Sequence, residues 1–428
     1  MSDYLFLLES RLSHAQSQAL AQMQKAAGAL GVNLYLAGGT VRDLVGGFPI
    51  EDLDFVVEGN ALKLARSLSK EGAEIRGQSE TLRTAELAFP SEVMASVSMA
   101  RSETYAKPGA APTVAPAPIL AHLRRRDFSI NAMGVSLNPQ SRGLLLDPTN
   151  AVADIERKEI RVLYNVSFFD DPSRLFRAVR FRTRLRYSLE AKTAAQFESA
   201  QRSDMAAKIT NEALALELRQ IAREPNAVEV LKALDKEKLL TALSPRLRGP
   251  ALNWQLLVKA DKASQSLAEA GLPAPSLALF LHLLLRKLPP REQTQLAKRI
   301  ALSKKEWQTI QAFEAGAKRL DMEVLSKEAA RPAQLYQLFA AASPDLLLLL
   351  LIESSQKKVV ARIQTYLKKY LPLRAQLPEI ELQEMGVAPG TDRYRKILDA
   401  FFFELLKGKV HTRTQQMKLL HALAQSTR

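Results

Sequence analysis

Near its beginning the chain reads Ala37-Gly38-Gly39-Thr40-Val41-Arg42-Asp43, and nine residues later it reads Asp52-Leu53-Asp54. The apolar run at residues 33–37 has strand character, and the two glycines after it permit a tight backbone turn. A helix is predicted from Val41 onward. The backbone amides of Gly38 to Val41 therefore lie at a helix N-terminus, which attracts an anion. The stretch predicts a strand, a turn and a helix around a phosphate cradle.

The second part of the pattern is a pair of carboxylates, Asp52 and Asp54, in a run that continues into Phe55-Val56-Val57. On a strand, residues two apart share a face, so both carboxylates project from one side while Leu53, Phe55 and Val57 pack on the other. Two carboxylates beside a phosphate cradle suit Mg²⁺-dependent phosphoryl transfer. The alternatives are an ordinary turn and a solvated strand face. A P-loop is excluded because neither Lys-Ser nor Lys-Thr follows the glycines.

Another constellation lies further along the chain, in Asp171, Arg174, Arg177, Arg180 and Arg184. Their spacing places these side chains along one side of a helix, and such a row is often only a solvated face. Its first two members, however, pair an acceptor with a donor, which match the amino group and ring nitrogen of cytosine or adenine. Uracil and guanine oppose both groups. Each mispaired buried polar group costs about 1–3 kcal/mol, so two would give roughly hundredfold discrimination without a nucleic-acid template.

These motifs resemble, in their order along the chain, those of the class II tRNA nucleotidyltransferases, which are the CCA-adding enzymes and their bacterial poly(A) polymerase relatives. The glycine turn with its two aspartates is similar to motif A of that family. The later matches are Leu123-Arg124-Arg125-Arg126-Asp127-Phe128-Ser129-Ile130-Asn131-Ala132-Met133 for motif B, Asp147-Pro148 for motif C, and Asp170-Asp171-Pro172-Ser173-Arg174-Leu175-Phe176-Arg177-Ala178-Val179-Arg180-Phe181 for motif D. The family usually begins motif D with Glu-Asp.

Two shorter segments add to the resemblance. They are Arg101-Ser102-Glu103-Thr104-Tyr105 with Pro108, Gly109 and Pro112, which leads into motif B, and Met385-Gly386-Val387-Ala388-Pro389-Gly390 near the C-terminus. The match is close over residues 33–187 and thin beyond them.

The resemblance implies a role for each matched residue. Asp52 and Asp54 would be catalytic and would hold Mg²⁺, in a two-metal mechanism, while Asp171 and Arg174 would select the base. The other residues that it implies in nucleotide binding are Gly38, Gly39, Arg42, Arg126, Asn131, Arg177 and Arg180. Among these, Gly39 and Arg42 would hold the triphosphate, Arg126 the triphosphate or sugar, and Asn131 would make a nucleotide or structural contact.

One position departs from the family pattern. Relatives often carry an acidic residue on the strand before the Ala-Arg-x-Glu segment, and simple alignment puts Ser96 there. Serine cannot replace a carboxylate as an anionic metal ligand. Either Glu92 takes this role through a shifted register, or the site relies on Asp52 and Asp54.

The pattern of the chain changes near residue 165. Before it, strand-like runs at residues 33–37, 53–57, 85–89, 94–99 and 134–137 alternate with helices, and after it nearly every segment has a helical pattern. Residues 108–118 hold four prolines, which predict an extended connector. With the resemblance, the expected fold class is α+β: a polymerase-β-like nucleotidyltransferase head with a mixed sheet, then an all-α neck, body and tail. The predicted segments are the catalytic head 1–145, the neck 146–215 with the nucleotide-selecting helix, the body 216–330 and the tRNA-binding tail 331–428.

Composition limits the partners and the setting. The net charge of +15 over 428 residues makes a polyanion the natural partner, nucleic acid before membrane. The lack of cysteine excludes disulfides and thiolate metal sites, and the scattered histidines show no metal-ligand spacing and no His-Asp dipeptide. No export signal is expected at the N-terminus, and the most apolar run, residues 346–352, is far below the ~20 residues of a membrane span. A cytoplasmic protein without a membrane partner is expected.

The predicted function is the addition of CCA to tRNA 3′ ends, on the acceptor arm, from CTP and ATP. Enzymes that add only A, only CC or poly(A) need the same motifs and stay open, as does a catalytically inactive RNA-binding relative, against which the intact carboxylate pair argues. Two basic groups in the helical half are expected to contact the tRNA backbone, with a solvated face as the alternative. They are Lys357, Lys358, Lys368, Lys369 and Arg374, and Lys407, Lys409 and Arg413. The sequence gives no signal for the oligomeric state.

Overall fold

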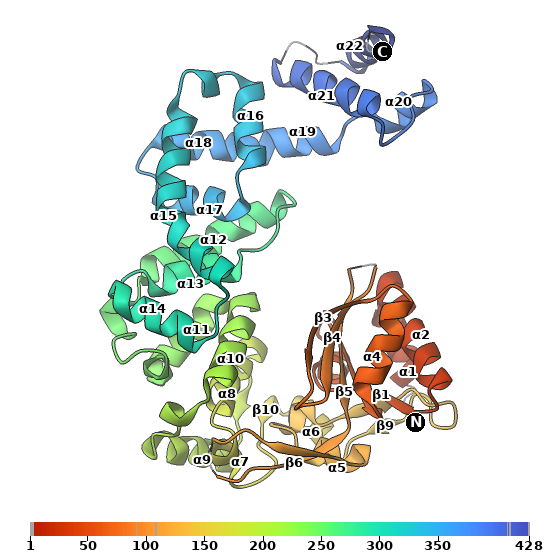
Figure 1. Cartoon of the computed structure of the whole chain (residues 1–428), viewed down its shortest axis with the longest axis vertical. Helices are drawn as coiled ribbons and strands as arrows, with labels where there is room; N and C mark the ends of the chain where they lie inside the picture. The colour runs from red at the N-terminus through yellow and green to blue at the C-terminus, as the bar shows by residue number, and fades with distance from the viewer. Residues whose placement is uncertain (1–3, 91, 108, 409, 411, 427–428) are drawn as a thin grey trace. The chain divides into compact units, whose positions relative to one another are not determined.

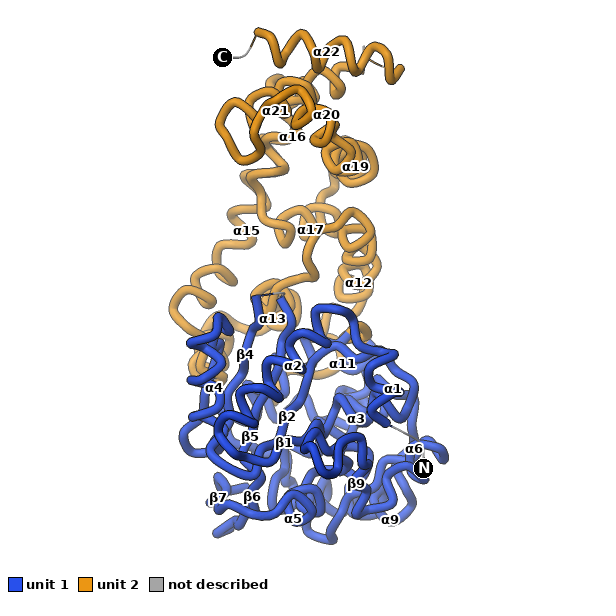
Figure 2. The backbone as a smooth tube through the Cα atoms, turned by 90° about the vertical axis from the view of Figure 1, so that its right-hand side faces the viewer, with its two compact units in different colours: residues 1–224, 229–243 blue, residues 225–228, 244–428 orange. Residues whose placement is uncertain are grey.

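The computed structural model describes residues 4–90, 92–107, 109–408, 410 and 412–426. The chain divides into two compact units, one of residues 1–224 and 229–243 and the other of residues 225–228 and 244–428 (Figure 2). The finer division into head, neck, body and tail stays a prediction.

A mixed sheet forms the centre of the first unit. Among the described residues it has seven strands in the order β3-β4-β5-β2-β1-β8-β9, and of its pairs β2 with β5 is parallel and the others are antiparallel. The strands are β1 (Asn33–Ala37), β2 (Leu53–Glu58), β3 (Glu74–Ser79), β4 (Thr84–Ala88), β5 (Met94–Met99), β8 (Gly134–Ser136) and β9 (Leu145–Leu146). The expected mixed sheet is confirmed, while the polar edge strand β3 and the short β9 were not predicted.

Helices cover one face of this sheet. Helices α2 (His14–Ala29) and α4 (Ala61–Lys70) pack against it, and α1 (Tyr4–Arg11) lies on the same side (Figure 1). Leu53, Phe55 and Val57 of β2 are at most 1% exposed beneath them, as their alternation predicted. Burial of these side chains fixes which face of β2 points toward the helices.

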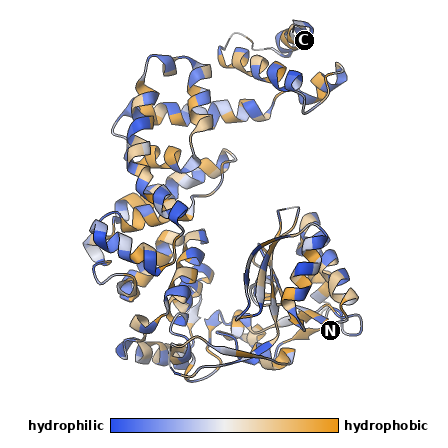
Figure 3. Cartoon of the chain, viewed as in Figure 1, coloured by the Kyte–Doolittle hydropathy of each residue, from blue (hydrophilic) through white to orange (hydrophobic). Residues whose placement is uncertain are grey.

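Most helices of the chain alternate hydrophobic and hydrophilic residues along their length (Figure 3).

The opposite face of the sheet is only partly covered. Helix α5 (Ile119–Arg124) contacts β2, and its Ile119 and Leu123 pack in one apolar cluster with Tyr35 and Val56. The strand register places Asp54 beside Ser96, and Ser96 beside Glu86, in one row on this face. The uncovered part of the face is therefore polar.

A two-stranded hairpin replaces the predicted extended connector. Strand β7 (Thr113–Pro116) pairs antiparallel with β6 (Arg101–Thr104), and β6 contacts α5. Gly109, between the strands, donates its backbone N–H toward the carbonyl oxygens of Phe169 and Asp170 at 3.1 and 3.2 Å. The hairpin therefore connects the head to the helices that follow. Pro108 lies outside the described residues.

The remainder of the first unit is mainly helical, as the change near residue 165 predicted. Its elements are α3 (Gly39–Gly46), α6 (Ala151–Glu156), α7 (Ser167–Asp170), α8 (Arg174–Leu185), α9 (Ala191–Arg202), α10 (Asn211–Arg223) and α11 (Ala227–Lys236), with a short parallel pair of β10 (Glu159–Ile160) and β11 (Ser188–Leu189).

The second unit is all-α over its described residues, as expected of a helical body and tail. Its longer helices are α12 (Trp254–Glu269), α13 (Leu277–Leu285), α14 (Pro290–Arg299), α15 (Lys304–Leu325), α16 (Pro332–Ala341), α17 (Pro344–Glu353), α18 (Lys357–Thr365), α19 (Leu371–Ala375), α20 (Glu379–Glu384), α21 (Asp392–Leu406) and α22 (Arg413–Ser426). The apolar run at 346–352 lies in α17, where Leu347 to Leu350 are buried and Ser343 caps the start. No single described helix is long and apolar enough to cross a membrane; α16 and α17 pass that test only as a pair, and they bend by 110° at the break between them.

A ladder of buried ion pairs joins α8 to α10. Glu217 is 2% exposed, and its carboxylate oxygens lie 2.8 Å from Nε of Arg177 and 3.5 Å from Nε of Arg180. Glu224, which follows α10, takes a hydrogen bond from Arg180 at 2.9 Å and lies 3.9 Å from Arg184. The arginine row of α8 therefore faces carboxylates rather than bulk water.

We expect Glu217→Gln to destabilise the first unit by about 3 kcal/mol, because removing one member of a buried ion-pair network leaves its partners uncompensated. Urea unfolding of the full chain measures this loss. The matched control is Glu212→Gln on the exposed side of the same helix, which we expect to change stability by less than about 0.5 kcal/mol. Equal losses in the two variants would show that the ladder contributes no stability.

Candidate active site

The glycine turn is fastened to the two aspartates by short hydrogen bonds. The Thr40 hydroxyl donates to the backbone oxygen of Asp52 at 3.0 Å and accepts from the backbone N–H of Asp54 at 2.7 Å. The backbone N–H of Gly39 donates to Oδ2 of Asp54 at 3.1 Å. The turn and the acidic segment therefore form one unit, in which the Gly39 amide already has a carboxylate partner.

The two carboxylates differ in their surroundings. Asp54 lies in β2, but Asp52 lies just before the strand begins, which corrects the expectation that both stand on it. Oδ1 of Asp54 also accepts from the Ser96 hydroxyl at 2.8 Å, whereas no partner to the Asp52 carboxylate is present among the described residues. Burial, and the nearby carboxylates of Asp54 and Glu51, raise the pKa of Asp52. A cation beside Asp52 would relieve this repulsion.

The register of β2 with β5 answers the question of the third acidic position. Asp54 pairs with Ser96, without a shift, and Ser96 donates a hydrogen bond to it. Glu92 lies before β5 begins, in the connection after β4, and so is not the neighbour of Asp54. A hydroxyl therefore stands where relatives often carry a carboxylate.

Both glycines of the turn allow side chains to approach the backbone closely, and Gly38 also has a positive φ that disfavours other residues. Gly38 has φ of +68°, and a Cβ on it would lie 2.8 Å from Nη2 of Arg126. A Cβ on Gly39 would lie 3.1 Å from Oδ2 of Asp54. The absence of side chains at these positions lets a guanidinium and a carboxylate approach the backbone.

A pocket of about 350 Å³ lies over these groups. We call it the carboxylate pocket; its lining includes Gly39, Asp52, Asp54, Arg126, Arg180 and Leu216. Among the described residues, the Arg126 side chain has no hydrogen bond or ion pair in the structure, so its charge is available to an anion. Two carboxylates and one unpaired guanidinium thus meet in one pocket.

Arg42 also lines the carboxylate pocket, but its guanidinium is engaged within the protein. It is 3% exposed, donates to both carboxylate oxygens of Asp43 at 2.9 Å, and donates to Oδ1 of Asn131 at 2.9 Å. Asn131 in turn donates to Asp127 at 3.1 Å. Arg42 and Asn131 therefore tie the start of α3 to motif B.

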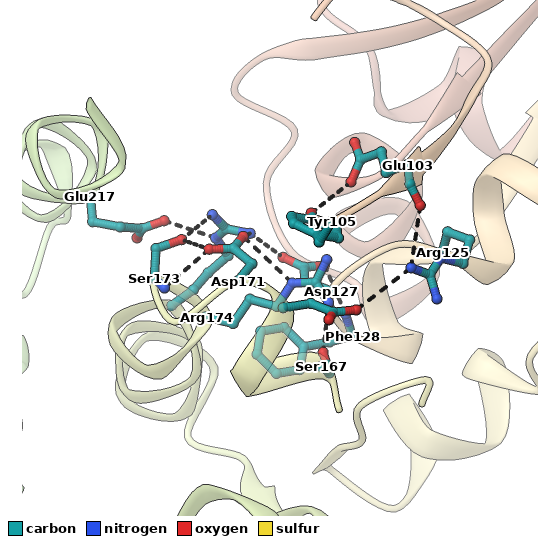
Figure 4. A network of polar contacts seen from close by, with 12 residues as sticks. Glu103, Tyr105, Arg125, Asp127, Phe128, Ser167, Asp171, Ser173, Arg174 and Glu217 are labelled. Carbon is teal, nitrogen blue, oxygen red and sulfur yellow. Dashed lines mark hydrogen bonds and ion pairs between the residues drawn. The ribbon is translucent and has the colours of Figure 1, made fainter. Parts of the chain in front are cut away.

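A larger cavity, of about 660 Å³, lies between the hairpin, α5, α8 and α10. We call it the neck cavity, and Asp171 and Arg174 line it. Nη1 of Arg174 donates to the hydroxyls of Tyr164 and Ser167, each at 2.6 Å, and Oδ1 of Asp171 accepts from the backbone and hydroxyl of Ser173 at 3.1 and 2.5 Å. These bonds fix both side chains, and Figure 4 shows the two residues side by side, Asp171 just before α8 and Arg174 at its first position.

Fixing the pair leaves one acceptor and one donor unused. Oδ2 of Asp171 accepts no hydrogen bond from a described residue, and neither Nε nor Nη2 of Arg174 donates one to a described residue. Nε is buried and faces Oδ2 of Asp171 at 3.6 Å, so Nη2 is the donor left for a ligand. Burial alone would lower the pKa of Arg174, but Tyr164 and Asp171 outweigh it and raise the pKa, so the guanidinium stays charged. An adjacent acceptor and donor are what the Watson–Crick edge of cytosine or adenine requires.

Asp127 connects the two cavities, and its role was missed in the sequence. Its carboxylate accepts from Asn131 and lies 3.2 Å from Nη1 of Arg177. Burial alone would raise the pKa of Asp127, but Arg177 and Arg126 outweigh it and lower the pKa to about 2. Asp127 therefore stays ionised and holds Arg177 at the boundary.

Other functional-site contacts were also missed. Glu217 and Glu224 neutralise the predicted nucleotide-binding residues Arg177 and Arg180. The two glutamates lie seven residues apart, in α10 and just after it, and this spacing matches that of Arg177 and Arg184, so it was a signal for the pairing. Asp147 of motif C lies away from both cavities and accepts backbone N–H groups of Ala151 and Val152 at the start of α6.

Comparisons with known proteins find relatives of this chain. Residues 34–161 match the family of the poly(A) polymerase head domain. An A-adding tRNA nucleotidyltransferase of Geobacter sulfurreducens is 28% identical over 99% of this chain and 49% of its own length, and one of Halalkalibacterium halodurans is 37% identical over 55% of this chain and 56% of its own length. This chain thus spans about half the length of the curated relatives it matches.

Solved structures extend the likeness to most of the chain. A tRNA nucleotidyltransferase complexed with a primer tRNA and an incoming ATP analog is 28% identical, with a TM-score of 0.58, over 82% of this chain and 99% of that one. A CCA-adding enzyme in an apo form, 24% identical, covers 98% of both chains with a TM-score of 0.59 and shows the shared fold.

We expect Gly38→Ala to destabilise the protein by about 1–3 kcal/mol, because alanine disfavours the left-handed conformation and its Cβ would press on Arg126. The matched control is Gly28→Ala, at an exposed position of α2 where a Cβ would meet no atom within 4 Å, which we expect to stabilise the chain by about 0.5 kcal/mol. Urea unfolding measures both values. A Gly38→Ala protein as stable as the wild type would contradict the close approach of Arg126.

Proposed function

We propose that this chain is a class II tRNA nucleotidyltransferase, and that it transfers nucleotides from CTP and ATP to the 3′ end of tRNA without a nucleic-acid template. The observation that carries the proposal is the unused acceptor and donor of Asp171 and Arg174, in a cavity that adjoins a pocket with two carboxylates. The geometry supports a base held at one end and a triphosphate at the other.

Asp52 and Asp54 would hold Mg²⁺ in the carboxylate pocket. The raised pKa of Asp52 fits this role, because crowded carboxylates favour a bound cation. No cluster of three or more His, Cys, Asp or Glu side chains suited to a metal ion lies in the described part of the chain. The metal would supply positive charge beside the reacting phosphate, where it would favour ionisation of the RNA terminal hydroxyl and departure of pyrophosphate.

Arg126 is the best-placed residue to bind the triphosphate directly. It lacks an ion pair among the described residues, lies against the Gly38 backbone and lines both cavities. Arg42, Arg177 and Arg180 already pair with carboxylates, so we propose that they shape the pocket walls and its electrostatic potential. The amides at the start of α3 add to the attraction for phosphate.

The helical half would bind the tRNA backbone by phosphate contacts that weaken with salt. The two predicted basic groups differ here. Lys357, Lys358, Lys368 and Lys369 have no ion pair among the described residues, whereas Arg374 lies 2.7 Å from Asp399. Lys407 pairs with Glu404 and Arg413 with Glu381, and Lys409 lies outside the described residues. The first group is therefore the better candidate. A cytoplasmic location stays a prediction.

An enzyme that adds only the final A is the second candidate, since two of the relatives reported above carry the name A-adding. The proposed base-selecting pair, Asp171 and Arg174, would accept cytosine and adenine alike, so it favours neither candidate. A tRNA ending one residue short of CCA, and one lacking CCA altogether, separate the two candidates. The first transcript would accept A from either enzyme, and the second would be extended only by a CCA- or CC-adding enzyme.

We expect Asp52→Asn to abolish incorporation into these transcripts while tRNA binding is retained, because the substitution removes a metal-binding charge and leaves the fold intact. Radiolabelled CTP and ATP with each transcript measure incorporation, and filter binding measures tRNA affinity. Asp204→Asn, at an exposed position outside both cavities, is the control and should incorporate like the wild type. Substantial nucleotide incorporation by Asp52→Asn in the presence of Mg²⁺ would contradict the assignment of Asp52 as a metal ligand.

We expect Asp171→Ala and Arg174→Ala each to raise UTP and GTP incorporation relative to CTP and ATP, by about ten- to a hundredfold in the ratio, because each removes one mismatch with the wrong base. Competition assays with all four triphosphates give this ratio. Arg124→Ala, at an exposed position of motif B, should keep the wild-type ratio. Unchanged ratios in both cavity variants would place base selection elsewhere.

A further inference from the structure

The boundary between the two cavities carries one apolar side chain. Four described residues line both the carboxylate pocket and the neck cavity: Arg126, Asp127, Arg177 and Leu216. The first three are charged. Leu216 is 48% exposed, so a large apolar group faces the passage among ionised neighbours.

Packing of α10 does not account for this leucine. The buried residues of the helix are Leu214, Glu217, Leu218 and Ile221, which fall on one stripe at helical spacing. Leu216 lies off that stripe. Its side chain is therefore not needed for the contact between α10 and the rest of the unit.

The part of the neck cavity next to Leu216 is apolar. Ala213 precedes it by one helical turn on the same side, and both line the neck cavity with Ile209, just before the helix. The small side chain of Ala213 leaves space next to Leu216. The proposed base-selecting residues line the same cavity from another part of the chain, Asp171 from just before α8 and Arg174 from its first position.

We propose that Leu216 contacts the nucleoside of the bound nucleotide, packing against its ribose and the adjoining part of the base. The inference rests on the proposed function, because a nucleotide with its triphosphate near Asp52 and its base at Asp171 must cross the shared boundary. An isobutyl group forms no hydrogen bond, so it adds affinity for ATP and CTP alike and leaves the choice of base to the polar pair. Leu216 would thus contribute affinity without specificity.

The experiment compares equilibrium binding of ATP, CTP and inorganic tripolyphosphate to the full chain by calorimetry. We expect Leu216→Ala to weaken ATP and CTP binding about five- to tenfold, as loss of a partly buried leucine contact predicts. Tripolyphosphate lacks a nucleoside, so its affinity for Leu216→Ala should equal its affinity for the wild type. Leu216→Met conserves volume and should keep nearly full affinity. Leu144→Ala removes a leucine of nearly equal exposure, 49%, outside both cavities and should change nothing.

The outcomes separate this inference from the proposed function. If the wild type binds ATP and Leu216→Ala binds it equally well, the inference is overturned and the proposed function stands. If Leu216→Ala weakens tripolyphosphate as much as ATP, the leucine acts through the fold and the inference is also overturned. A wild-type chain that binds no nucleoside triphosphate would instead overturn the proposed function itself.

Discussion

The carboxylate of Asp54 accepts a hydrogen bond on each of its oxygens, from the Gly39 amide on one side and the Ser96 hydroxyl on the other. These two bonds join the glycine turn to the centre of the sheet and hold β2 and β5 in the register that defines the site. Hydrogen bonds to an ionised acceptor are the stronger kind, and here they also fix the direction of the carboxylate. The start of α3, the position of Arg126 and the free carboxylate of Asp52 all depend on this arrangement.

Charge balance governs the rest of the site. Motif D brings three arginines onto one side of α8, and Asp127, Glu217 and Glu224 neutralise Arg177 and Arg180 rather than leaving their charge for a ligand. Buried guanidinium groups need such partners, since desolvation of an unpaired charge is costly. Among the described arginines that line the two cavities, Arg126 is the one without an ion pair, and Arg174 keeps donor nitrogens without a hydrogen bond. Arginines that face a buried carboxylate are held in the protein, and arginines without such a partner can bind a ligand.

The sequence was sufficient for the parts of this fold that local chemistry determines. The glycine pair, the alternation through Leu53, Phe55 and Val57, and the helical spacing from Arg174 are local patterns, and each appears in the structure. Contacts between segments far apart in the chain could not be predicted from these local patterns. The partner of Asp54 is set by strand register with Ser96, and the partners of Arg177 lie on another helix. The hairpin strand β7 was missed because its prolines suggested a connector, yet they fall where an edge strand tolerates them.

The ladder between α8 and α10 also has a consequence for synthesis on the ribosome. Arg180 and its partner Glu224 are 44 residues apart in the chain, so the arginines are translated first. At ordinary rates of elongation, this leaves Arg180 without Glu224 for about 2 to 9 s. During that interval a nascent segment of high positive charge emerges close to ribosomal RNA, a polyanion that it can bind. Completion of α10 ends this exposure, so a late-translated pair of glutamates determines when the basic segment ceases to be a nonspecific ligand for RNA.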